Sequence, residues 1–112
     1  MVKARTVIRG STPTHFFDSP VSVDNIADYR VSYEQNGEEV VCKKLGDDGC
    51  TVFTAESGST ISVTLTQEET FVFKCGNHLY SQVRMLLSDG SVITSDTFAL
   101  SVTKSINEEV MA

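Results

Sequence analysis

The sequence predicts an all-β protein: a single Ig-like β-sandwich of about seven or eight antiparallel strands with one or two single helical turns. Polar and apolar residues alternate over most of the chain, which is the period of a half-buried strand. Turn-forming residues separate these stretches at intervals of about 8–12 positions. The 112 residues, 40% of them hydrophobic, suffice for one packed domain. We assign residues 1–104 to the β-sandwich and residues 105–112 to a short C-terminal tail.

The strands are predicted from this alternation and from the turns that end it. Tyr29, Val31 and Tyr33 alternate with polar residues, and Asn36-Gly37 follows them. That pair tolerates the positive φ angles of a type I′ hairpin turn. Further strands are expected at residues 38–45, 50–54, 60–65, 79–87, 91–94 and 98–102. The residues predicted to face the core are Ile61, Val63, Leu65, Val83, Met85, Phe98, Leu100 and Val102.

Two short helical turns are predicted from Ser/Thr-x-x-Glu patterns. In such a capping box, each of the two side chains accepts a hydrogen bond from the backbone N–H of the other residue. Thr66 and Glu69 have this spacing, which predicts a single turn near Thr66–Thr70. Ser105 and Glu108 repeat it, which predicts a turn at Ser105–Glu109 or a frayed end.

The segment 65–75 is similar to one corner of an immunoglobulin variable domain. There, an L-T-x-E-D-T run leads to a tyrosine that lies two residues before a core cysteine. In this chain Phe73 takes the place of the tyrosine and Cys75 that of the cysteine. The similarity implies an Ig-like topology without the hydrogen bond of the tyrosine hydroxyl.

Charge and cysteine content restrict the partners and the compartment. Nine basic and fifteen acidic residues give a net charge of −6, which argues against nucleic acid as a partner. No apolar run is long enough to span a membrane, and no signal peptide is recognisable. The three cysteines lack a Cys-x-x-Cys pair and suit a reducing compartment. They are interpreted as small buried apolar residues, with a Cys42–Cys75 or Cys50–Cys75 bridge as the alternative.

Few residues suggest catalysis or metal binding. His15 beside two phenylalanines and His78 after Gly-Asn are interpreted as strand-end and loop residues, not as catalytic bases. Asp47-Asp48 lies between two glycines and fits turn chemistry better than a calcium loop. No known catalytic motif is present. We therefore expect no enzymatic activity, no catalytic residue, no metal and no cofactor.

Five segments form a distinctive combination along the chain. They are Arg9–Phe16, Tyr33–Gly37, Leu65–Thr70, Gln82–Arg84 with Asp89-Gly90, and Asn107–Val110. In this order they resemble a family of short structural proteins of tailed phages and prophages of Gram-positive gut bacteria, whose members read R-G-T-T-P-T-H-T-F, V-T-Y-x-Q-x-G, L-T-Q-E-E-T, Q-V-R-x-L-x-x-D-G and D-E-E-V. The pattern is also similar to the N-terminal β-sandwich domain of phage baseplate upper proteins.

The resemblance implies a virion structural protein of the tail or baseplate, made in the bacterial host cytoplasm and present in multiple copies. Its partners would be other virion proteins. The alternatives are a capsid decoration or head–tail junction protein, and a free-standing Ig-like adhesion or carbohydrate-binding module. Within the first motif, Arg9, Thr12, Pro13 and His15 are predicted to contact a partner, because distinctive residues in a loop or at a strand edge are more often functional than core residues.

Overall fold

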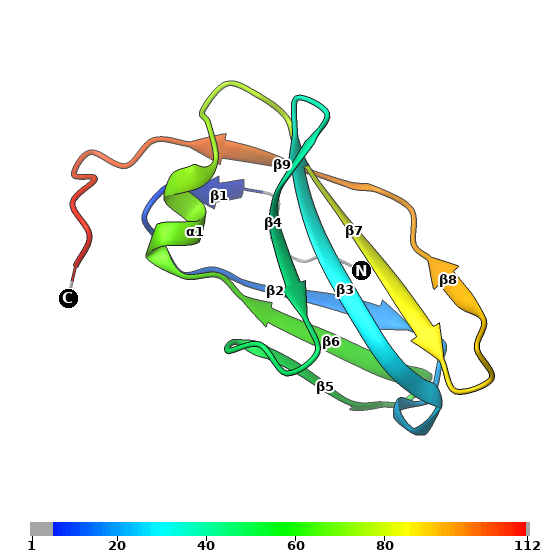
Figure 1. The fold of residues 1–112 in the computed structure, drawn as a ribbon. Coiled ribbons are helices and arrows are strands. Elements are labelled where there is room, and N and C mark those ends of the chain that lie inside the picture. The colour runs from blue at the N-terminus through cyan, green and yellow to red at the C-terminus, as the bar shows by residue number, and fades with distance from the viewer. Residues whose placement is uncertain (1–5, 112) are drawn as a thin grey trace.

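The computed structural model describes residues 6–111 and places two β-sheets face to face (Figure 1). The larger sheet has the order β1-β9-β7-β3-β4, and β8 also pairs with part of β7. The smaller sheet has the order β2-β6-β5. The strands are β1 (Thr6–Ile8), β2 (Thr14–Ser19), β3 (Ile26–Gln35), β4 (Glu38–Lys44), β5 (Cys50–Ala55), β6 (Gly58–Thr64), β7 (Leu79–Leu87), β8 (Val92–Thr94) and β9 (Phe98–Thr103).

The predicted Ig-like β-sandwich is confirmed, with differences in detail. The described residues contain nine strands, and one of them, the three-residue strand β1, was not predicted. In addition, β1 runs parallel to β9 while every other pair is antiparallel. A three-residue 3-10 helix, η1 (Val23–Asn25), precedes β3 and was not predicted.

The residues that the alternation predicted form much of the core between the sheets. Tyr29, Val31 and Tyr33 of β3 are at most 1% exposed. Seven of the eight predicted core-facing residues are buried, and the eighth, Phe98, is partly buried against the same cluster. Local period-two patterning therefore identified both the strands and the faces that they bury.

Local sequence signals set two of the connections. Asn36 and Gly37 have φ angles of 54° and 80°, the left-handed values that a type I′ turn between β3 and β4 requires. Helix α1 (Gln67–Val72) begins with the predicted capping box, in which Thr66 and Glu69 exchange both hydrogen bonds. The predicted helical turn near Thr66–Thr70 is thus confirmed.

The helical turn predicted at Ser105–Glu109 is wrong. Residues 104–111 have no helix, although half of the capping box forms: Ser105 N–H donates to Oε2 of Glu108 at 3.3 Å. The Ser105 hydroxyl donates instead to the carbonyl of Asn107 at 2.8 Å. Glu108 uses its other oxygen for an ion pair with Arg9, so a long-range contact competes with the local helical turn.

All three cysteines are free, so the alternative of a bridge to Cys75 is wrong. Cys50 is buried as expected and Cys42 is half-buried, but Cys75 is exposed. The corner formed by α1 nevertheless places Phe73 in the core, where its ring lies 5.8 Å from that of Tyr33. Phe73 therefore anchors the corner by packing.

Candidate interaction surfaces

The beginning of the first motif docks onto α1. Arg9 makes a 2.7 Å ion pair with Glu108 and donates a 3.0 Å hydrogen bond to the backbone carbonyl of Phe71. The Arg9 guanidinium carbon also lies 5.6 Å from the centre of the Phe71 ring. Gly10 N–H donates to Oγ1 of Thr70 at 2.9 Å. Gly10 has φ +83°, and a Cβ at this position would lie 2.6 Å from the Phe71 ring. Glycine thus allows both the left-handed turn and the close approach.

The C-terminal tail is held at the same place. Gln67 exchanges two hydrogen bonds with Met111, one to its carbonyl at 2.6 Å and one from its N–H at 2.8 Å. Together with the Arg9–Glu108 pair, these bonds hold a segment without regular secondary structure against α1. Its apolar side chains face solvent: Ile106 is fully exposed, Val110 is 53% exposed and Met111 is 78% exposed.

Three of the five recognised motifs therefore meet at one end of the sandwich. Arg9–Phe16, Leu65–Thr70 and Asn107–Val110 are far apart in sequence, and the contacts above join them. We call this region the tail junction and define it as Arg9, Gly10, Gln67, Thr70 and Glu108. Figure 1 shows β1, α1 and the C-terminal segment together at this end. The sequence pattern revealed the motifs but not their convergence, which depends on the tertiary fold.

The predicted contact residues fall into different environments. Thr12 is exposed, and Pro13 is half-buried immediately before β2. The carbonyl of Pro13 accepts a 3.0 Å hydrogen bond from Leu65 N–H. Because β2 pairs only with β6, Pro13 precedes an edge strand, where a missing N–H is tolerated. For Arg9, Thr12 and Pro13, partner contact remains a prediction.

His15 requires a correction. Its side chain is 0% exposed, so it is not available to a partner in this structure. The alternation of β2 turns His15, Phe17 and Ser19 inward. Nδ1 of His15 lies 2.7 Å from the Tyr33 hydroxyl in a hydrogen bond, while Nε2 is buried without a partner among the described residues. Burial lowers the pKa of His15 to about 4 because the core lacks the water that would solvate the charged form.

The other candidate chemical groups are not assembled into a site. His78 is exposed and its ring lies 6.0 Å from that of Tyr80. In residues 6–111, neither imidazole is hydrogen-bonded to a serine, a cysteine or a carboxylate. Asp47 shapes its turn by accepting a 2.8 Å hydrogen bond from Lys44 N–H. The part of the chain that the structure describes has no group of three residues able to hold a metal ion.

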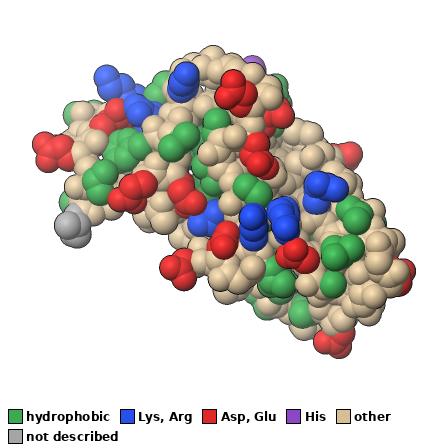
Figure 2. Space-filling view, in the orientation of Figure 1, with side chains coloured by type: hydrophobic (Ala, Val, Ile, Leu, Met, Phe, Trp, Pro, Cys, Tyr) green, Lys and Arg blue, Asp and Glu red, His purple; other side chains and the backbone are tan. Residues whose placement is uncertain are grey.

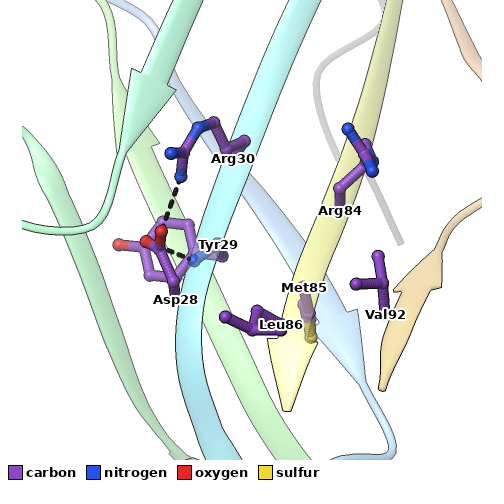
Figure 3. Close-up of a pocket in the computed structure, with 7 residues that line it drawn as sticks. All are labelled: Asp28, Tyr29, Arg30, Arg84, Met85, Leu86 and Val92. Carbon is purple, nitrogen blue, oxygen red and sulfur yellow. Dashed lines mark hydrogen bonds and ion pairs between the residues drawn. The ribbon is translucent and has the colours of Figure 1, made fainter. Parts of the chain in front are cut away.

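A depression lies on the outer face of the larger sheet, between β3 and β8. It has a volume of about 260 Å³, and its rim consists of the half-buried Asp28 and the exposed Arg30, Arg84, Leu86 and Val92. Asp28 Oδ2 and Arg30 Nη1 form a 2.7 Å ion pair, drawn as a dashed line in Figure 3, where Arg84 points away from this pair. This ion pair lowers the pKa of Asp28. Arg84 makes no ion pair with any described residue.

A row of basic residues crosses this face of the sheet. Arg30 of β3 lies opposite Lys44 of β4 on one side and opposite Arg84 of β7 on the other. All three side chains are exposed. Figure 2 shows Lys and Arg side chains in a band across this face, with hydrophobic side chains beyond them toward β8. Asp28 already neutralises Arg30, so Lys44 and Arg84 are the charges of this row without an ion-pair partner among the described residues. Sequence reasoning missed this row because it depends on the register of three strands.

In residues 6–111 no helix is long and apolar enough to cross a membrane.

Comparisons with known proteins identify the fold. No family model matches the chain, and no curated protein matches it. Among solved structures, CopC from Methylosinus trichosporium OB3b is 17% identical, with a TM-score of 0.55 over 93% of this chain and 87% of that chain. Murine CRIg is 10% identical, with a TM-score of 0.42 over 93% and 98% of the two chains. The V domain of amphioxus IgVJ-C2 is 16% identical, with a TM-score of 0.34 over 87% and 97%. The likeness to CopC shows a shared β-sandwich fold.

Proposed function

We propose that this chain is a structural protein of a tailed-phage particle, located in the tail or baseplate. It acts through contacts with other virion proteins, without catalysis, and is present in multiple copies. The sequence resemblance supports this proposal over nearly the whole chain. The structural observation that supports it best is the tail junction, which brings three of the recognised motifs together around a tail with exposed apolar side chains.

The tail junction fits a role in protein contact because it orders a segment that adds little to the core. The side chains of Ile106, Val110 and Met111 are exposed to water. A partner that covered them would gain about 25 cal/mol of binding free energy for each Å² of apolar surface buried. Three contacts nevertheless hold this segment in place, the Arg9–Glu108 ion pair and the two hydrogen bonds between Gln67 and the backbone of Met111. A partner that binds a pre-ordered segment does not have to order it on binding, which favours association.

Fractionation of particles tests the location. After prophage induction in the host that encodes the chain, particles are purified, heads and tails are separated, and the chain is detected with an antibody. We expect the chain in the tail fraction. Its presence only in the head fraction would contradict the tail assignment and favour a decoration or junction protein. Presence only in the particle-free lysate would overturn the proposal and favour the free adhesion module.

A variant of the tail tests the contact itself. Ile106 makes no contribution to the core, so Ile106→Asp should leave the melting temperature unchanged while incorporation into particles falls. Ile106→Leu, which keeps the apolar surface, is the matched control and should be incorporated like the parent. Full incorporation of Ile106→Asp would show that the tail is not the contact surface.

A further inference from the structure

The C-terminal tail and the outer-face depression have complementary chemistry. The tail, residues 105–111, presents Glu109 together with the exposed apolar side chains of Val110 and Met111. The depression presents Arg84 together with Leu86 and Val92, which are 40% and 51% exposed. An acidic group flanked by apolar side chains on one surface thus matches a basic group flanked by apolar side chains on the other.

The charges that remain free on both surfaces are of opposite sign. On the tail, Glu108 is already paired with Arg9, which leaves Glu109 without an ion-pair partner among the described residues. At the depression, Asp28 neutralises Arg30, which leaves Arg84 unpaired. Each surface therefore has one free charge that the other can neutralise, while the neighbouring Lys44 adds a second positive charge to the row.

The two surfaces cannot meet within one molecule. The tail is held at α1, whereas the depression lies beside β8, and Figure 1 places these elements at opposite ends of the sandwich. The longest dimension of the molecule is 46 Å. Only another molecule can bring such a tail to this depression.

We propose that the C-terminal tail of one copy docks into the outer-face depression of a second copy. Glu109 pairs with Arg84 of the second copy, and Val110 and Met111 cover its Leu86 and Val92. The contact joins two different surfaces, so a copy that donates its tail can also receive one, and the assembly can continue from copy to copy. This inference deepens the proposed function by naming one partner, a second copy of the chain.

Sedimentation equilibrium of the purified full chain with two charge reversals tests this docking. The parent should self-associate at concentrations of about 0.1–1 mM, because a contact made by one short segment is small and weak. Arg84→Glu and Glu109→Lys should each raise the dissociation constant about ten-fold, and the double variant should restore association. Lys74→Glu and Glu56→Lys reverse exposed charges elsewhere and should behave like the parent. Thermal melts should show that all variants are folded, since both reversed residues are exposed.

Two results would overturn the inference. One is a parent chain that remains monomeric throughout the concentration range, and the other is association that neither reversal weakens or that the double variant fails to restore. Because the assay uses the purified chain alone, a negative result leaves the particle assignment standing. Conversely, absence from particles would refute the proposed function while the self-association could still be measured.

Discussion

The buried imidazole of His15 makes the stability of this protein depend on pH. In the folded state its pKa is lowered to about 4 by desolvation, whereas an unfolded chain has a histidine pKa of about 6.5. Between these values the unfolded state binds more protons than the folded state, so unfolding becomes easier as pH falls. Above pH 7 the group is neutral in both states and has no effect.

The size of the effect follows from the two pKa values. The pKa differs by about 2.5 units between the unfolded and the folded state, so the free energy of unfolding falls by about 3 kcal/mol once the pH is below 4. About 2 kcal/mol of it is already lost at pH 5. Asp28 and Asp89 have lowered pKa values, but they are not buried and titrate at lower pH than His15 does in the unfolded chain. The loss between pH 7 and pH 5 is therefore assigned to His15.

Urea unfolding at pH 7.5 and pH 5.0 measures this loss. The matched variant is His15→Asn, which keeps a polar group that can bond the Tyr33 hydroxyl and does not titrate. The parent should lose about 2 kcal/mol of unfolding free energy over this interval, and the variant should lose much less. Equal pH dependence of both proteins would refute the assignment to His15.

Three further predictions concern the core, the helix cap and the cysteines. Leu100→Ala, at 2% exposure, should lower the unfolding free energy by about 2–5 kcal/mol, and a melting temperature within a degree or two of the parent would contradict the registry of β9. Thr66→Ala removes the oxygen that accepts from Glu69 N–H and should cost about 0.5–2 kcal/mol in chemical denaturation; an unchanged midpoint would show that the cap adds nothing. A thiol reagent should label the exposed Cys75 under native conditions and leave the buried Cys50 unmodified, as read by mass spectrometry of peptides. The reverse order of labelling would contradict this placement.

The features that the sequence predicted correctly depend on neighbouring residues. The alternation in β3, the Asn36-Gly37 turn and the Thr66–Glu69 capping box each require contacts within a few positions of the chain. The physical rules for these features are local, so one sequence suffices to apply them. The same rules indicated which face of β6, β7 and β9 lies in the core.

The features that were missed depend on distant partners. Ser105–Glu109 has the local pattern of a helical turn, but Glu108 pairs with Arg9, ninety-nine positions away. The parallel pairing of β1 with β9 joins the two ends of the chain. His15 was expected at a contact surface, and its burial becomes evident only when β2 is packed against the larger sheet and the His15 ring reaches Tyr33 of β3. The row formed by Lys44, Arg30 and Arg84 likewise exists only once three strands are aligned.

The central claim, that this chain is a repeated structural component of a phage tail, is tested most directly by its copy number in purified particles. Quantitative mass spectrometry with an isotope-labelled standard gives that number relative to a protein of the tail and a protein of the head. The account predicts several copies in each particle, in a fixed ratio that persists in isolated tails. Absence of the chain from washed particles, or a trace amount that varies between preparations, would contradict it.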